Sequence, residues 1–286
     1  MKRTVTYLAL AVYGSLLAAC SVTRVGYNYA DTVVRYMASN YLDLDAVQSE
    51  DLKPRLVRLH QWHRVNELPA YVELLRSASQ RAANGITAED VAWGLGNVRA
   101  HYRKFAAKAV EDAAPVLATL GTAQLAALEH KFAENNEKYA KKFLSLDDEK
   151  RRRAQTQRML ERFSDFAGDL SSEQEARIER FALAHERHVA LRFEDRQRWQ
   201  RDLVALLRQQ RAPQELGRSL ADMFDKPELR RSEEFLREDA RWDEDLGRLI
   251  VDLDQSLSPK QRARVVRRLS DYAEDFSVLA GKGQPT

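Results

Sequence analysis

Apolar residues recur every three or four positions along most of this chain. That spacing places them on one face of an α-helix, with charged and amide side chains on the other face. The pattern, divided at proline, glycine and capping residues, predicts helices over 29–41, 46–83, 88–119, 122–144, 148–169, 172–210, 214–224, 228–254 and 259–280. We expect Pro54 and Pro69 to divide or kink the second helix, because an internal proline removes a backbone hydrogen bond.

Composition favours the same fold class. Of 286 residues, 44% are apolar and 31% are charged, and isoleucine is scarce. These values exclude collagen-like, disulfide-rich and disordered chains and argue against an all-β fold. The sequence therefore predicts an all-α, elongated multi-helix bundle over 29–280, with possible sub-bundles 29–145 and 146–280 and a disordered tail over 281–286.

The first twenty residues differ from the rest. A basic pair, Lys2 and Arg3, precedes an almost wholly apolar stretch that is typical of an export signal and too short for a membrane span. It ends in Leu17-Ala18-Ala19-Cys20, which resembles the lipobox of bacterial lipoproteins, in which the cysteine thiol takes a diacylglycerol before cleavage. We expect a signal peptide over 1–19, cleavage between Ala19 and Cys20, and a lipidated N-terminus and short tether over 20–28.

The alternative is a secretory signal with a chance cysteine. We disfavour it because Cys20 is the chain's only cysteine and stands where lipidation needs it. The resemblance implies a membrane partner through the lipid on Cys20. Since Ser21, and not aspartate, follows the cysteine, it implies the periplasmic face of the outer membrane.

Loss of residues 1–19 also changes the chemistry of the mature chain. It removes two bases and no acid, which leaves 44 basic against 43 acidic residues and weakens any nucleic-acid interpretation. With its sole thiol alkylated, the chain can form no disulfide. The fold must then rest on packing alone.

Several predicted helices begin with related sequences. Leu170-Ser171-Ser172-Glu173-Gln174 and Leu257-Ser258-Pro259-Lys260-Gln261 both read Leu-Ser-x-x-Gln, and Leu120–Gln124 is a degenerate copy. The serine and glutamine of each fit a capping box. The pattern also resembles the Leu-Thr-x-x-Gln motif of small periplasmic chaperones. Its irregular spacing argues against a solenoid.

Two basic clusters are candidates for contact with anionic headgroups, lipopolysaccharide phosphates or an acidic partner. The first is Lys150, Arg151, Arg152 and Arg153, and the second is the series Arg262, Arg264, Arg267 and Arg268. Acids directly precede the first cluster and follow the second. A solvated surface with internal ion pairs is therefore the simpler interpretation.

Two histidine pairs, His60 with His63 and His185 with His188, place imidazoles three residues apart on a helix. Such pairs can share a metal, but neither matches an H-E-x-x-H or H-x-x-E-H arrangement. A hydrogen-bonded structural imidazole is the simpler interpretation. We find no phosphate-binding glycine loop, nucleophile elbow or dinucleotide fingerprint, and we expect no cofactor.

Four segments serve as landmarks: Arg24-Val25-Gly26-Tyr27-Asn28, the run from Trp62 to Tyr71, Glu134–Glu137, and Arg151–Arg153 with Arg158. They resemble an uncharacterised family of Gram-negative lipoproteins that carry a domain of unknown function. The likeness covers about Cys20 to Leu269. It implies location and helical architecture and transfers no catalytic residue.

A polar group in the middle of the chain is the remaining candidate site. If buried together, its members would form a network that fixes helix register or, alternatively, a binding site. These residues are Asn135, Asn136, Glu137, Arg158 and Arg162.

The sequence as a whole favours a non-enzymatic outer-membrane lipoprotein that binds an envelope protein or maintains the envelope. A chaperone-like clamp for unfolded or outer-membrane proteins is the alternative, and a metal-dependent hydrolase is third. An exposed apolar concavity would favour the clamp, and converging histidines and carboxylates would favour the hydrolase.

Overall fold

A computed structural model describes residues 23–144 and 147–281, which are helical with short connections and contain no strand. This confirms the all-α prediction. The predicted signal peptide, Ala19, Cys20 and residues 282–286 lie outside the described residues. Within the predicted tether, residues 23–28 are helical, and Gly281 still belongs to the last helix.

The helices follow the predicted pattern closely. Their bounds are α2 Ala30–Leu42, α3 Ala46–Asn66, α4 Leu68–Asn84, α5 Ala88–Leu117, α6 Thr122–Phe143, α7 Asp148–Ala167, α8 Ser172–Ala184, α9 Glu186–Leu207, α10 Pro213–Asp225, η1 Pro227–Arg230, α11 Glu233–Gln255 and α12 Pro259–Gly281.

Three helix boundaries differ from expectation or decide between alternatives. The chain divides at Glu67, beside Pro69, whereas α3 continues across Pro54. The predicted helix 172–210 is wrong in one respect, because it is divided at His185 into α8 and α9. The helix expected from 228 begins at Glu233, since η1 intervenes and the Ser232 side chain accepts from the Phe235 amide to cap α11.

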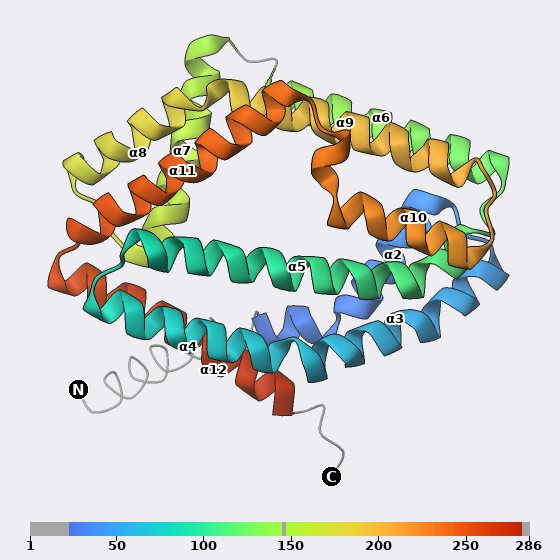
Figure 1. The fold of residues 1–286 in the computed structure, drawn as a ribbon, viewed down its shortest axis with the longest axis horizontal. Helices are drawn as coiled ribbons and strands as arrows, with labels where there is room; N and C mark the ends of the chain where they lie inside the picture. The colour runs from blue at the N-terminus through green and yellow to red at the C-terminus, as the bar shows by residue number, and fades with distance from the viewer. Residues whose placement is uncertain (1–22, 145–146, 282–286) are drawn as a thin grey trace, which may run out of the picture.

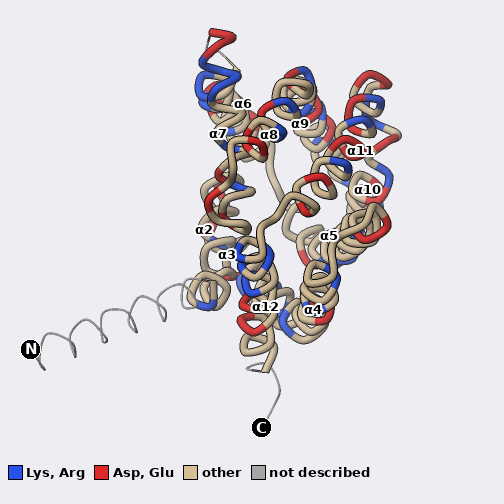
Figure 2. Tube along the Cα trace, turned by 90° about the vertical axis from the view of Figure 1, so that its left-hand side faces the viewer, with Lys and Arg blue, Asp and Glu red and all other residues tan. Residues whose placement is uncertain are grey.

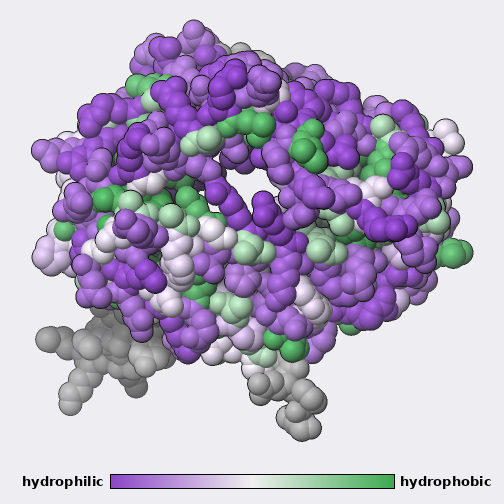
Figure 3. All heavy atoms as spheres, viewed as in Figure 1, coloured by the Kyte–Doolittle hydropathy of each residue, from purple (hydrophilic) through white to green (hydrophobic). Residues whose placement is uncertain are grey.

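The helices form a frame around a central opening (Figure 1). α3 and α4 run along one edge and α8 and α9 along the opposite edge, with α5 and α11 between them. The space-filling view from the same side shows an opening through the molecule near its centre (Figure 3). Among the described residues, no helix has the length and apolarity needed to cross a bilayer.

The two halves of the chain repeat one arrangement. α2 packs on α3 and α7 on α8; α3 and α4 pack on α5, and α8 and α9 pack on α11. The last helix of each half packs on the other half: α6 lies against α9, and α12 lies against α4. α10 and η1 are additional elements of the second half. The ranges 29–145 and 146–280 are therefore joined by an exchange of helices.

Interlocked capping boxes hold the ends of each half together. Gln174 Nε2 donates to the Ser256 carbonyl at 3.1 Å, and Gln261 Nε2 donates to Gln174 Oε1 at 2.9 Å and to the Asp169 carbonyl at 2.7 Å. Each glutamine oxygen also accepts the backbone N–H of its own cap, Ser171 or Ser258. The predicted boxes are thus confirmed, and they also bind each other.

The first half repeats this lock. Gln48 Nε2 donates to the Thr119 carbonyl at 3.1 Å, and Gln124 Nε2 donates to Gln48 Oε1 at 2.6 Å and to the Asp43 carbonyl at 2.8 Å. The Asp45 and Gln48 box was not identified in the sequence. The four glutamines occupy equivalent places, which identifies the two halves as structural repeats.

The apolar core gathers at the two ends of the frame. At one end, Val110, Leu125, Leu207, Leu216 and Met223 join α5, α6, α9 and α10. At the other end, Ile178, Phe181, Leu249 and Leu253 join α8 and α11. Figure 2 shows α2 and α7 on one broad face of the frame and α5, α10 and α11 on the other.

Replacing Gln174, which is 1% exposed, with leucine should destabilise the fold. The change removes the bonds of the Gln174 amide to the Ser171 N–H, the Ser256 carbonyl and Gln261 Nε2, and each lost hydrogen bond costs about 0.5–1.5 kcal/mol. We expect Gln174→Leu to lower the free energy of unfolding by about 2–4 kcal/mol in urea denaturation. Gln255→Leu, at an exposed position at the end of α11, is the matched control and should change it by less than about 0.5 kcal/mol. Equal effects would contradict the lock.

Candidate functional site

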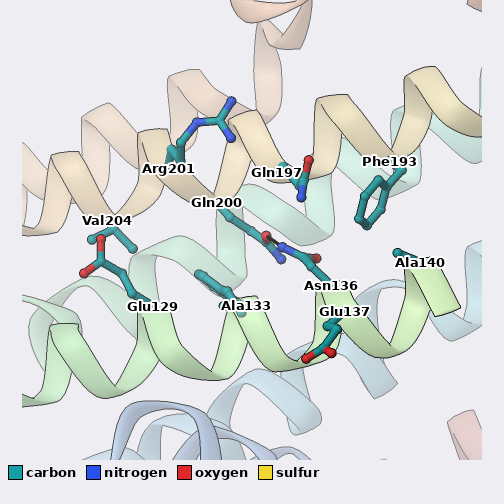
Figure 4. A pocket seen from close by; sticks show the side chains of 11 residues that line it. Glu129, Ala133, Asn136, Glu137, Ala140, Phe193, Gln197, Gln200, Arg201 and Val204 are labelled. Atoms are coloured by element: carbon teal, nitrogen blue, oxygen red, sulfur yellow. Dashed lines mark hydrogen bonds between the residues drawn. The ribbon is translucent and has the colours of Figure 1, made fainter.

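A pocket of about 450 Å³ lies between α6 and α9 (Figure 4). Asn136 Nδ2 donates to Gln200 Oε1 at 2.7 Å across it, and these side chains come from facing helices. Asn136 is 9% exposed and its Oδ1 atom has no hydrogen-bond partner within the described part of the chain. A buried amide oxygen without a donor is unfavourable. The pocket therefore offers an unused acceptor.

The pocket has apolar walls and charged edges. Phe132, Ala140, Phe193 and Val204 line it beside the amide pair. At the edges, Glu137 pairs with Lys141 at 2.6 Å, and Glu129 pairs with Arg208. Arg201 also lines the pocket and is exposed, and no described carboxylate lies within ion-pair distance of it.

Side-chain size explains why the pocket lies on this seam. On the equivalent seam, the small Ser79 hydroxyl approaches the Ser270 hydroxyl at 3.0 Å, and also donates to the Val266 carbonyl, so α4 and α12 pack closely. On the α6 and α9 seam, the Tyr139 and Phe193 rings stack with centroids 5.2 Å apart. Aromatic side chains thus separate α6 from α9 and leave space between them.

The predicted polar network is only partly assembled. Asn135 Nδ2 donates to the Tyr41 hydroxyl at 2.9 Å, and Asn136 binds Gln200. Glu137 is exposed and pairs with Lys141. Arg158 lies over the Phe143 ring at 4.7 Å, and Arg162 lines a separate cavity. The structure does not bring these arginines to the asparagines.

Two of the landmark segments meet near the N-terminal end of the described chain. Tyr27 Oη lies 2.9 Å from His63 Nδ1, and Arg64 donates to Asn28 Oδ1 at 3.0 Å. Arg24 Nε donates to Asp275 of α12 at 2.6 Å, and Asp275 is only 4% exposed. We call Arg24, Tyr27 and Asn28 the docking segment. It fixes the start of the described chain to α3 and α12.

Burial sets the protonation of this cluster. Desolvation raises the pKa of Tyr27 to about 12 and lowers the pKa of His63 and of His60, whose ring lies 4.7 Å from that of Tyr27. A neutral His63 can accept a hydrogen bond from the Tyr27 hydroxyl at Nδ1. His60 and His63 thus act as structural partners of the docking segment.

A buried carboxylate at the α3 and α4 break was missed in the sequence. Glu67 is fully buried, and its oxygens lie 2.6 Å from Lys104 Nζ and 2.8 Å from His101 Nδ1. A buried charge requires such partners. The available signal was an acid directly before Leu68-Pro69, where the helix must break and the side chain turns inward. His101 and Lys104 carried no signal of their own.

The second histidine pair lies at the equivalent break between α8 and α9. His185 Nε2 lies 3.2 Å from Asp245, and His188 Nε2 lies 3.0 Å from Asp239. Each imidazole therefore has its own carboxylate on α11. Within the described residues, no group of three or more histidines, cysteines or carboxylates is arranged to hold a metal ion.

Acids pair with every member of the first basic cluster and with one member of the second. Lys150 lies 2.8 Å from Asp147, Arg152 pairs with Glu186, and Arg153 pairs with Glu149. Arg151 lies 2.7 Å from Asp148. In the second cluster, Arg262 donates to Asp254 at 2.9 Å and to the Ala82 carbonyl at 2.6 Å. These contacts neutralise much of the charge of the first cluster, whereas no described carboxylate lies within ion-pair distance of Arg264, Arg267 or Arg268.

Two further cavities are mainly apolar. One of about 520 Å³ lies between α2, α3 and α5 and includes Leu56, Leu59 and Phe105. The other, of about 530 Å³, includes Trp93, Phe163 and Trp242, from α5, α7 and α11. Both volumes fall within the range of small-molecule sites.

The fold and these sites define an all-α frame with a partly polar pocket on one of its two equivalent seams. The chain belongs to the Family of unknown function (DUF6279), whose model matches residues 40–237. The match includes α3 to η1 and excludes the docking segment. No curated protein and no solved structure matches the chain.

The buried histidines predict a pH-dependent stability. Burial lowers the pKa of His60, His63 and His185 below the usual 6.5, so the unfolded chain binds protons that the folded chain does not. Their neutral forms support the full stability above about pH 6.5, and stability falls as the pH drops through that value. We expect the free energy of unfolding to decrease from about pH 7 to pH 5.

The histidine variants identify the source of that slope. His185→Gln should reduce it, whereas His130→Gln, at a side chain that is 75% exposed, should leave it unchanged. Urea denaturation across the pH range provides the measurement. A slope that persists in His185→Gln and disappears in His130→Gln would contradict the assignment.

Proposed function

We propose that this chain is a non-enzymatic lipoprotein, anchored through Cys20 on the periplasmic face of the outer membrane, that binds a segment of another envelope protein. The docking segment is the observation that supports the anchored role most directly. Cys20 precedes Arg24 by four residues, and an extended chain spans at most about 3.6 Å per residue. A lipid on Cys20 would therefore hold the frame within about 14 Å of its attachment point.

The contacts of the docking segment give such an anchor a fixed starting point on the frame. Arg24, Tyr27 and Asn28 each bond a different side chain, on α12 or α3. Without these contacts, residues 24–28 would be free to move relative to the frame. With them, residues 24–28 have a fixed place on the frame.

The pocket between α6 and α9 supports the binding role. Asn136 Oδ1 would accept a hydrogen bond from a backbone or side-chain amide N–H, while Phe132 and Phe193 would contact an apolar side chain. Arg201 lies at the edge and would pair with an acidic group. This combination fits a peptide segment that carries an apolar residue beside an acidic one.

The histidine geometry favours the non-enzymatic role over the hydrolase alternative. His60 and His63 contact Tyr27, and His185 and His188 pair with separate carboxylates. Each imidazole therefore lies against a tyrosine or a carboxylate of the fold.

Substitution of the predicted lipid attachment site tests the anchor. Cys20→Ser removes the thiol that must be acylated. We expect the variant to remain unprocessed at the inner membrane or to leave the outer-membrane fraction, as measured by sucrose-gradient fractionation and mass spectrometry of the N-terminus. Ser21→Thr, which retains the thiol, is the control. Normal outer-membrane fractionation of Cys20→Ser would contradict the anchor.

Site-specific cross-linking tests the pocket. A photo-reactive side chain at Gln197, which lines the pocket, should give one discrete adduct with an envelope protein in cells. The same group at the exposed neighbour Arg196 is the control and should not. The double variant Asn136→Leu/Gln200→Leu replaces the amide pair with apolar groups, so it should fold yet lose the adduct. Identical adducts from both positions, or an adduct unaffected by the double variant, would contradict the assignment.

A chaperone-like clamp remains the second candidate, and the two apolar cavities between α2, α3 and α5 and beside Trp93 and Trp242 favour it. A clamp would bind unfolded chains through apolar surface and slow the aggregation of a denatured client at equimolar ratio. We expect little suppression in a light-scattering assay, because acids and bases alternate along most helix surfaces. Strong suppression would reverse the order of the two candidates.

A further inference from the structure

The exposed side of residues 25–40 carries no charged residue. Its large side chains are Val25, Tyr29, Val33, Val34, Tyr36 and Met37, and Tyr36 is 73% exposed. The remaining exposed positions are Gly26, Thr32 and Asn40. In a chain with 31% charged residues, this is an unusual stretch of helix surface.

Helical spacing places most of these side chains together. Tyr29 N–H donates to the Val25 carbonyl and Val33 N–H donates to the Tyr29 carbonyl, so helical bonding continues through the junction before α2. At about 100° per residue, Val25, Tyr29, Val33, Tyr36 and Met37 share an arc of about 120°. We call these five residues the α2 face.

The charged residues of the segment lie off this face. Arg24 bonds the buried Asp275, Asp31 lines the cavity between α2, α3 and α5, and Arg35 is half-buried. No residue of α2 is buried, so core packing does not require the apolar side chains that point outward. A continuous apolar strip of this kind indicates an interaction surface.

The position of the strip in the chain identifies its partner. Val25 follows Cys20 by five residues, and the docking segment fixes that region to the frame. Tyrosine side chains suit the membrane interface, where the ring contacts acyl chains and the hydroxyl stays hydrated. A surface without charge next to a lipid attachment point fits the bilayer better than an aqueous face.

We propose that the α2 face lies in the interface of the membrane to which Cys20 is anchored, an inference that rests on the proposed lipid anchor. Because α2 and α7 share one broad face (Figure 2), that face is turned toward the bilayer. The frame then lies flat on the membrane, with the axis of its central opening perpendicular to the bilayer. In this orientation α5, α10 and α11 face the periplasm.

Fluorescence quenching in vesicles tests this orientation. The lipidated full-length chain is placed in vesicles of phosphatidylethanolamine and phosphatidylglycerol, and an environment-sensitive dye is attached at Tyr36→Cys. Acylated Cys20 offers no competing thiol. Leu229→Cys, at a residue that is 77% exposed in η1 on another element, is the matched control. We expect a blue-shifted emission and about twofold or greater quenching by brominated lipid chains at position 36, with little quenching at position 229.

A second variant introduces negative charge on the α2 face. Val25→Glu/Tyr29→Glu leaves Cys20 in place and alters no buried residue, so the chain should still float with vesicles and keep its helical circular dichroism. We expect the label at position 36 to lose most of its quenching, because burying two carboxylates in the interface is unfavourable.

Three results would overturn the inference in distinguishable ways. If the chain fails to float with vesicles, both the lipid anchor and the proposed position of the α2 face are wrong. If the chain floats but position 36 is no more quenched than position 229, the anchor stands and the orientation is wrong. If position 36 is blue-shifted without quenching by brominated lipid, a protein surface covers the α2 face.

Discussion

The geometry of the frame depends on the reciprocal bonding of paired capping glutamines. Gln48 with Gln124, and Gln174 with Gln261, each satisfy the start of two helices at once. An amide is suited to this because it carries a donor and an acceptor on one group. Each pair therefore determines where two distant helices begin and which carbonyls they approach. The other helices pack on the helix starts that these pairs hold in place.

The exchange of helices between the halves closes the frame and also creates its asymmetry. α12 lies against α4 and α6 lies against α9, so neither half buries its surfaces alone. Small serines let the first seam close, whereas aromatic rings hold the second apart and leave the pocket at Asn136. The same architecture thus provides one structural seam and one with space for a ligand. Buried ionisable residues at the helix breaks, Glu67 and His185, match charged partners on α5 and α11.

The sequence predicted the fold class and most helix boundaries because these depend on local rules. Period 3.6, Ser171 and Ser258 as caps, and the break beside Pro69 all act over a few residues. The break at His185 was missed since no proline or glycine marks it. At this break the buried His185 imidazole lies 3.2 Å from Asp245 of α11, a neighbour that the local sequence does not reveal.

Sequence patterns could not predict which residues distant in the chain contact each other. The repeat was hidden because Asp45-x-x-Gln48 differs in its cap from Ser171-x-x-Gln174, and only the bonds between glutamines show the equivalence. Asn136 was identified as a candidate, but its partner Gln200 lies 64 residues away. Arg158 and Arg162 lie apart from Asn136, because α7 packs on α8 and α12. Arg158 contacts Phe143 at the end of α6, and Arg162 lines another cavity.

Hydrogen exchange at increasing denaturant is the most direct test of the central claim that exchanged helices make the two halves one unit. If the exchanged helices join the halves, peptides from α6 and α9 lose protection at the same denaturant concentration as peptides from α4 and α12, in a single cooperative step. If residues 29–145 and 146–280 are independent bundles, the α4 and α6 peptides would open at one concentration and the α9 and α12 peptides at another. That result would contradict the account.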